Sequence, residues 1–111
     1  MSLTFDRLRR ANLRRAFDMS PDGVDVWDNS KWACALAGEV GELCNKIKKG
    51  YRGFSGEAPT RAALAGELAD IVTYADLLAA KLGIDLGVAV CAKFNEVSQR
   101  PAIASPVRLD D

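Results

Sequence analysis

The stretch ALAGEVGEL, residues 35–43, decides the fold, because it places two glutamates among small and apolar residues. The pattern returns as ALAGELADI in residues 63–71, with each acidic residue 28 positions after its counterpart. The acidic residues are Glu39 and Glu42 in the first stretch, and Glu67 and Asp70 in the second. An α-helix turns by roughly 100° per residue, so side chains three positions apart lie on the same flank. The repeat therefore predicts two helices with equivalent roles, each carrying a pair of carboxylates.

Each pair lies beside an apolar stripe of its helix. The stripes consist of Leu36, Val40, Leu43 and Ile47 in the first helix, and of Leu64, Leu68, Ile71, Ala75 and Leu82 in the second. If the two helices pack through these stripes, all four acidic side chains converge on one edge of the contact. Gly38 and Gly41 lie on the opposite face, where they would let another helix approach closely at a cost of roughly 1 kcal/mol each in helix propensity.

Converging carboxylates repel one another, and a fold tolerates them when their charge is neutralised. Hard divalent cations bind oxygen ligands, and Mg²⁺ in addition binds the phosphates of substrates, while Mn²⁺ accepts the same ligands. The alternative is that each pair is an ordinary solvated flank of a helix. Because the pattern is repeated with matching offsets, it favours a cation site, although it does not name a reaction.

Periodicity and capping residues along the chain predict an all-α fold and no strand. Helices are expected at residues 3–18, from Asn29 or Ser30 as cap to residue 49, from the cap Thr60 to residue 82, and from the cap Asp85 to residue 99. Gly83 is expected just after the third helix. The segment KKGYRGFSGEAPT, residues 48–60, breaks the pattern between the second and third helices. In the first helix, the candidate buried residues are Phe5, Leu8, Ala11, Leu13 and Phe17.

A length of 111 residues fits a single helical domain over residues 1–100, followed by a tail, residues 101–111, that is flexible or docked on another subunit. The formal net charge is zero, which gives no reason to expect nucleic acid as a partner. No apolar run approaches the roughly 18 residues of a membrane span, so no membrane association is expected. With three cysteines and no export signal, free thiols in a cytoplasmic protein are expected.

The chain contains no histidine. Its absence excludes Ser-His-Asp and Cys-His mechanisms and every metal motif that includes histidine. Acid–base or metal chemistry must therefore rest on carboxylates, lysines, tyrosines or water.

GEVGEL followed by ELADIVTYADLLA resembles the ExxE and ExxD signature of the MazG-like, all-α nucleoside triphosphate pyrophosphohydrolases, especially their small single-domain members from phages and mobile elements. KFNEVSQR, residues 93–100, resembles the basic start of the family's last motif, and the likeness covers about residues 27–100. It implies a four-helix bundle-type fold that forms a homodimer or homotetramer. It also implies Mg²⁺-dependent hydrolysis of a nucleoside or deoxynucleoside triphosphate to the monophosphate and pyrophosphate, which cleanses the nucleotide pool. The metal ligands and catalytic residues implied are Glu39, Glu42, Glu67 and Asp70.

Six further residues are candidates for binding the substrate. Lys93 lies on the apolar stripe of the fourth helix, where it either faces the triphosphate or extends along the bundle edge. Lys46 either faces phosphate or pairs with Glu42 one turn away. The other four candidates are Trp27 and Trp32, which similar enzymes would use to stack the base but which equally suit burial or an interface; Tyr74, on the carboxylate flank; and Asn95, which matches the last motif by position.

Val97 stands where many family members have asparagine, and Pro101 follows Arg100 directly, so the sequence leaves the preference for base and sugar open.

Two alternatives to the nucleotide hydrolase remain. One is an enzyme of the same kind that acts on another pyrophosphate-containing phosphoester. The other is a non-catalytic helical interaction module whose acidic quartet lies on its surface.

Overall fold

The computed structural model describes residues 2–52 and 58–110, and all regular structure in these two ranges is helical. The elements are α1 (Phe5–Met19), a 3₁₀ turn η1 (Gly23–Val26), α2 (Asn29–Arg52), α3 (Arg61–Lys81) and α4 (Leu86–Ser98). The predicted all-α class is confirmed, and the predicted helix boundaries are close to those observed. Within the predicted break between the second and third helices, residues 53–57 lie outside the described residues.

The helix ends follow the capping residues closely. Thr60 Oγ1 accepts a hydrogen bond from the Ala63 amide at 3.1 Å, and Asp85 Oδ1 accepts one from Val88 at the same distance, as predicted. Gly83 has a φ of 70°, which only glycine adopts easily, and it terminates α3 as expected. The predicted cap of the second helix is wrong.

Asp28, rather than Asn29 or Ser30, caps α2, because its carboxylate oxygen Oδ1 accepts a hydrogen bond from the Lys31 amide at 2.8 Å. Asn29 is already the first helical residue. An Asp, Asn and Ser in succession are all good capping residues, so composition alone does not select the correct one.

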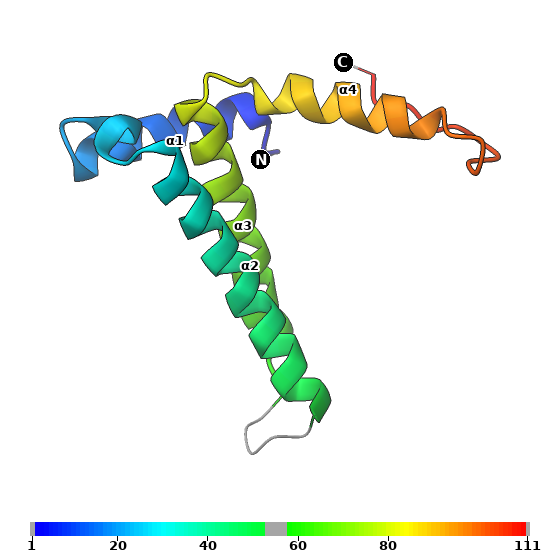
Figure 1. Ribbon diagram of the computed structural model, residues 1–111, viewed down its shortest axis with the longest axis horizontal. Helices are drawn as coiled ribbons and strands as arrows, with labels where there is room; N and C mark the ends of the chain where they lie inside the picture. Colours follow the sequence, from blue (N-terminus) through cyan, green and yellow to red (C-terminus); the bar gives the residue numbers. More distant parts are fainter. Residues whose placement is uncertain (1, 53–57, 111) are drawn as a thin grey trace.

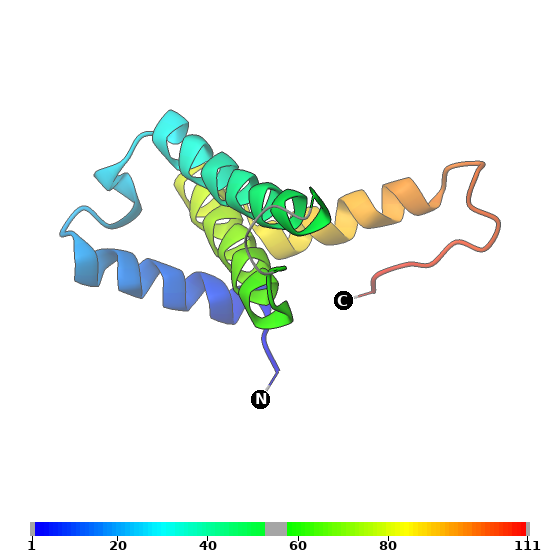
Figure 2. The ribbon, with the colours of Figure 1, turned by 90° about the horizontal axis from the view of Figure 1, so that it is seen from below.

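The helices α2 and α3 form a long hairpin, and α1 lies across the end of it that is remote from the connection between them (Figure 1). The helix α4 projects away from the hairpin and contacts mainly α1 near its own first turn. At that contact Gly87 allows close approach, because a Cβ atom on it would lie 3.2 Å from the Cβ of Phe5. The tail then turns back along α4 (Figure 2), where the Asn95 side chain hydrogen bonds to the backbone of Leu109.

A buried polar cluster joins α1 to α3. Asp76 is only 1% exposed, and its oxygens accept hydrogen bonds from Arg9 Nε at 3.0 Å and from Asn12 Nδ2 at 2.9 Å. Arg9 also donates to the carbonyl oxygen of Ile84 at 2.8 Å, which ties the start of the chain to the turn before α4. Since both charges are paired and hydrogen bonded, the cluster fixes how α1 crosses α3.

The apolar core is small. Among the described residues, the buried apolar side chains are Trp32, Leu77 and Ala79. The radius of gyration is 17.0 Å, whereas a compact domain of this length has about 13 Å. Because α4 stands apart from the α2–α3 hairpin, the chain on its own does not close a four-helix bundle.

Several predicted core positions are wrong. In α1, Phe17 is 59% exposed and Ala11 is also exposed, whereas the buried residue of that helix is Asn12. In the predicted stripe of the third helix, Leu68 is 55% exposed and Leu82 is 48% exposed. The apolar pattern does not predict which of these side chains are exposed. Polar side chains rather than apolar stripes fill part of the contact between α1 and α3 and part of the contact between α2 and α3.

The predicted stripe of the second helix is only half-buried, and two of its members, Val40 and Ile47, are exposed. No heavy atom lies within 4 Å of a Cβ built on Gly38 or Gly41, so no helix of the described chain approaches the face that these glycines leave open. Across residues 2–52 and 58–110, no helix is long and apolar enough to cross a membrane.

Candidate metal centre and adjoining cavity

Three carboxylates meet in the contact between α2 and α3. One oxygen each of Glu39, Glu67 and Asp70 lies within 4.8 Å of the others. Glu67 is buried, Glu39 is half-buried and Asp70 is exposed, so the group opens from the helix contact toward solvent. Glu42 is exposed and lies outside this group of three, so the structure brings together three of the four residues that the sequence predicts to be near one another.

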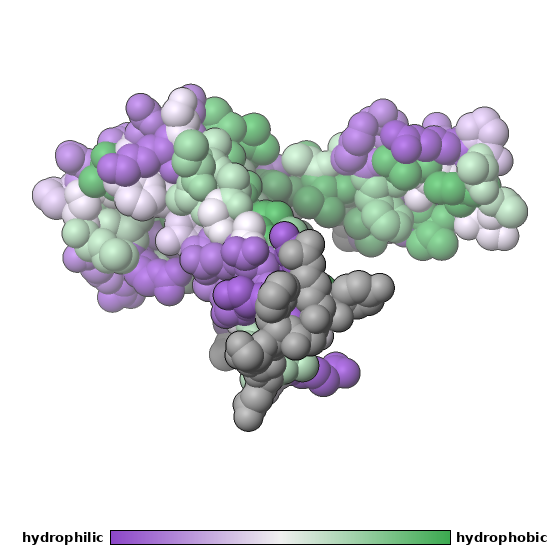
Figure 3. Space-filling model, turned by 60° about the horizontal axis from the view of Figure 1, so that its bottom comes forward, coloured by the Kyte–Doolittle hydropathy of each residue, from purple (hydrophilic) through white to green (hydrophobic). Residues whose placement is uncertain are grey.

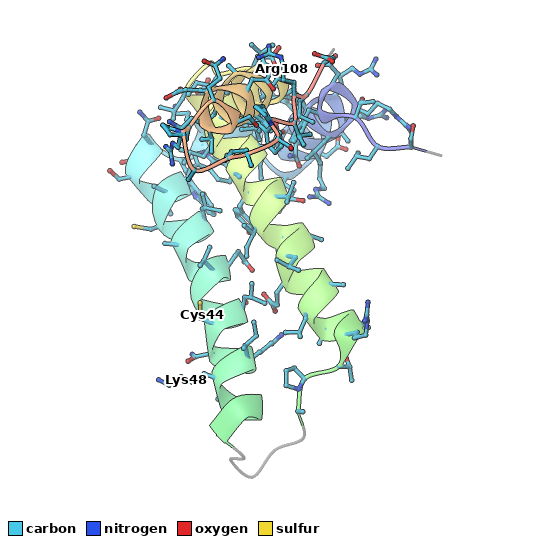
Figure 4. The ribbon with its side chains drawn as sticks, turned by 90° about the vertical axis from the view of Figure 1, so that its right-hand side faces the viewer. Cys44, Lys48 and Arg108 are labelled. Atoms are coloured by element: carbon cyan, nitrogen blue, oxygen red, sulfur yellow. The ribbon has the colours of Figure 1, made fainter. Side chains whose placement is uncertain are left out.

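The hairpin geometry brings these residues together. Glu39 stands one turn after Leu36 and one turn before Leu43, and all three residues are half-buried. Side chains from α2 and α3 turn toward one another across the contact, whereas Lys48 points away from it (Figure 4). Glu67 therefore lies inside the helix contact, whereas half-buried Glu39 and exposed Asp70 lie toward its edge.

Glu67 has one paired oxygen and one unpaired oxygen. Its Oε1 accepts a hydrogen bond from Lys46 Nζ at 2.6 Å, which is also an ion pair. Its Oε2 is the one fully enclosed side-chain nitrogen or oxygen of the described residues without a hydrogen-bond partner. A buried acceptor left unpaired is costly, so this oxygen is where a cation or a donor would gain most. A set of carboxylate oxygens suits Mg²⁺ or Mn²⁺, and the residues present fit that expectation.

The electrostatics of the group are those of crowded negative charge. The pKa of Glu39 is raised, first by desolvation and then by repulsion from Glu42, Asp70 and Glu67, while Lys46 opposes the shift. The pKa of Lys46 is also raised, mainly by its hydrogen bond to Glu67, against the effect of desolvation. Lys46 thus provides the internal counter-charge for the group.

A cavity of about 500 Å³ adjoins the carboxylates, and Asp70 belongs to both. Its aromatic wall is formed by Trp27, Trp32 and Tyr74. The ring centroids of the two tryptophans are 4.5 Å apart and tilted by 55°, and that of Tyr74 is 6.3 Å from Trp32. Trp32 is fixed because its indole N–H donates to the Val24 carbonyl at 2.8 Å. The remaining lining residues come from α1, η1 and α3, and include Asn12, Arg15, Ala16, Met19, Val26 and Thr73.

Two predicted substrate ligands lie elsewhere. Lys93 is exposed on α4 and its ammonium group lies 3.4 Å from Glu96. The Asn95 side chain donates to the Leu109 carbonyl at 3.0 Å and accepts from the Leu109 amide at 2.7 Å. The structure therefore brings together Lys46, Trp27, Trp32 and Tyr74 with the carboxylates, but not Lys93 or Asn95.

The sequence pattern did not indicate that α1 contributes to the cavity. Asn12 and Arg15 stand three positions apart on one side of that helix, and Ala16 and Met19 continue the same side. Because two of these four residues are polar, apolar periodicity does not single out this side as buried. A buried asparagine that faces a buried aspartate 64 positions away has no signal in a single sequence.

Comparison with known proteins finds no matching family model, no matching curated protein and no matching solved structure.

Proposed function

We propose that this chain is a Mg²⁺-dependent nucleoside triphosphate pyrophosphohydrolase, which cleaves between the α and β phosphates and releases pyrophosphate. The observation that carries the proposal is the unpaired buried oxygen of Glu67 within a group of three carboxylates that opens into an aromatic cavity through Asp70. Such a site offers one end for charged phosphates and another for a flat ring. The MazG-like pattern in the sequence agrees with this assignment.

Glu39, Glu67 and Asp70 would hold the cation, and Glu42 stands one turn from Glu39 at the exposed side of the group. When bound, Mg²⁺ would neutralise phosphate charge and lower the pKa of a coordinated water. One of these carboxylates would also orient or deprotonate the attacking water. Mn²⁺ is expected to substitute, since it accepts the same ligands.

Lys46 would serve the phosphates. Its ammonium group lies 2.6 Å from Glu67 in the present arrangement, and 44% of its side chain is exposed. Once a cation neutralises Glu67, the lysine can exchange that carboxylate for a phosphate oxygen, because its flexible stem allows rotation toward solvent. The aromatic wall of the cavity would hold the base, because tryptophan and tyrosine rings offer faces for stacking.

The proposed enzyme works as a homo-oligomer. The solvent-accessible surface is 8229 Å², whereas a compact monomer of 12.0 kDa has about 6,000 Å². Apolar surface is visible on the projecting arm formed by α4 and the tail (Figure 3), with Val88, Val90 and Phe94 among the exposed residues. Because α4 points away from its own carboxylates, Lys93 would serve a substrate only at the site of another copy.

The same apolar arm favours a second candidate, a helical interaction module without catalysis. In that case the carboxylates would have no role in binding a cation. A metal response therefore separates the two functions. An enzyme that acts on another pyrophosphate-containing phosphoester remains the alternative within the same reaction class.

The test is pyrophosphate release from a panel of ribo- and deoxynucleoside triphosphates, with Mg²⁺ and with a chelator. The native protein should release pyrophosphate and the monophosphate from at least one nucleotide, and only with the metal. Glu39→Gln should lose this activity, whereas Asp18→Asn should retain it, because Asp18 is an exposed carboxylate outside the site. Release of inorganic phosphate instead of pyrophosphate, or full activity in Glu39→Gln, would contradict the proposal.

A further inference from the structure

The amide group of Asn12 has a fixed orientation. Asn12 is 2% exposed, and its Nδ2 donates to Asp76 Oδ2 at 2.9 Å and to the Thr73 carbonyl at 3.3 Å. Both partners are oxygens that can only accept, so the nitrogen must face them and the oxygen must face the other way. Asp76 is in turn bound by Arg9, so the carboxylate that accepts from Asn12 is itself held in place.

The remaining oxygen, Asn12 Oδ1, accepts no hydrogen bond from the residues that the structure describes. It is nevertheless not fully enclosed, because Glu67 Oε2 alone among the described side-chain atoms is both enclosed and unpaired. Asn12 lines the aromatic cavity of about 500 Å³. Asn12 thus brings to the wall of this cavity an amide whose nitrogen is held by two partners and whose oxygen is left without one.

We propose that Asn12 determines specificity by accepting a hydrogen bond from an N–H group on the edge of a nucleobase that stacks in the aromatic cavity. This inference rests on the proposed function, and it adds the chemical property for which the base is selected. A fixed, desolvated acceptor discriminates strongly, because a ring without a donor leaves it unpaired. Exposed Arg15 lines the same cavity and supplies N–H groups for an acceptor beside the donor of the base.

The position of the cavity beside the carboxylate group determines which end of a bound nucleotide would lie near Asp70. Asp70 belongs both to the cavity and to the carboxylate group, so the phosphates of a nucleotide lie on that side. Asn12 is on α1 and reaches the cavity from the face where it bonds to Thr73 and Asp76 of α3. The aromatic wall of the same cavity would hold the ring, so the edge of the base would meet Asn12.

The two tryptophans of the chain both line the cavity, so their fluorescence reports its occupancy directly. Each of the four deoxynucleosides, which carry no phosphate to be repelled by the carboxylates, is titrated into the native protein in the presence of chelator, beside an analogue without the N–H donor. The analogues carry purine, 2-pyrimidinone, N3-methylthymine and 6-methoxypurine in place of adenine, cytosine, thymine and guanine. The natural base that binds most tightly should bind at least roughly tenfold more tightly than its analogue.

Asn12→Leu removes the acceptor and should reduce this ratio to near one. Arg10→Leu is the matched control, because Arg10 is an exposed residue of the same helix outside the cavity, and it should keep the ratio of the native protein. Equal affinity for base and analogue in the native protein would overturn the inference even if Asn12→Leu does not fold. Absence of quenching by every deoxynucleoside would also overturn it, whereas the proposed function would still be decided by pyrophosphate release.

Discussion

Glu67 is a buried carboxylate with one oxygen paired to Lys46 and the other alone. In a helix contact, such a group is stable only when its charge is compensated, and the ammonium group of Lys46 balances that charge while it binds only one of the two oxygens. The lysine therefore does in the metal-free chain part of what a divalent cation would do. The ammonium group of Lys46 and the divalent cation compete for the carboxylate of Glu67. Removing the lysine should therefore destabilise the protein without metal and increase its stabilisation by metal.

Lys46→Met should lower the melting temperature in chelator by several degrees, because it leaves the buried carboxylate of Glu67 without its partner. The same variant should show a larger increase in melting temperature on addition of Mg²⁺ than the native protein, because the competitor is gone. Lys48→Met is the matched control, since Lys48 is exposed and points away from the contact. Equal responses of the Lys46 and Lys48 variants in thermal denaturation would count against this role.

Glu39→Gln should raise the melting temperature of the metal-free protein at neutral pH. The folded-state pKa of Glu39 lies above its ordinary value of 4.5, so ionisation of Glu39 costs stability as the pH rises through the raised pKa. The gain should therefore be present at neutral pH and vanish below pH 4.5, where the native side chain is protonated in both states. Thermal denaturation in chelator across this pH range measures it, and a loss of stability at neutral pH would contradict it.

At the scale of elements, the clamp formed by Arg9, Asn12 and Asp76 fixes the crossing of α1 over α3. Arg9→Met should reduce the free energy of unfolding by about 3 kcal/mol, because it leaves the buried carboxylate of Asp76 without its charged partner. Arg10→Met is the control, because Arg10 follows Arg9 directly in the sequence and its side chain is exposed. Urea denaturation of both variants measures the difference, and similar midpoints would show that the clamp does not support the fold.

The helices and most of their caps could be predicted from the sequence, because capping chemistry is local. Thr60, Asp85 and Gly83 act through contacts within four residues of themselves, so their roles are visible in the pattern. The convergence of Glu39, Glu67 and Asp70 was also predictable, because repeated spacing places matching residues on matching flanks.

The cavity wall supplied by α1 could not be predicted in the same way. Asn12 is buried because Asp76 and Thr73 of another helix accept its hydrogen bonds, and no local pattern encodes such a pairing. Apolar periodicity also misplaced Leu68 and Phe17, since it assumes that the most apolar side of a helix faces the chain's own core. In an open arrangement such as this one, apolar side chains face outward.

At the scale of the whole molecule, that open arrangement is the main physical feature. The radius of gyration and the exposed surface both exceed those of a compact monomer, and α4 carries apolar side chains into solvent. Folded domains are only marginally stable, so a chain with such a small buried core gains much by pairing with a second copy.

The native protein should accordingly have a mass of at least twice 12.0 kDa by light scattering after size exclusion. Phe94→Asp should shift the mass toward that of one chain or lower the melting temperature strongly, because it places a charge on the exposed apolar side of α4. Gln99→Asp adds the same charge at the end of α4 and should leave the assembly intact. A folded native protein with the mass of one chain would contradict this prediction.

The most direct measurement is Mn²⁺ binding by electron paramagnetic resonance, because it tests the carboxylate group without requiring that the substrate be known. The native protein and Asp18→Asn should bind Mn²⁺, with Mg²⁺ as competitor, and Glu67→Gln should bind it at least roughly tenfold more weakly. If the native protein binds no Mn²⁺, or if Glu67→Gln binds it as tightly as the native protein does, the carboxylates between α2 and α3 are not a metal centre.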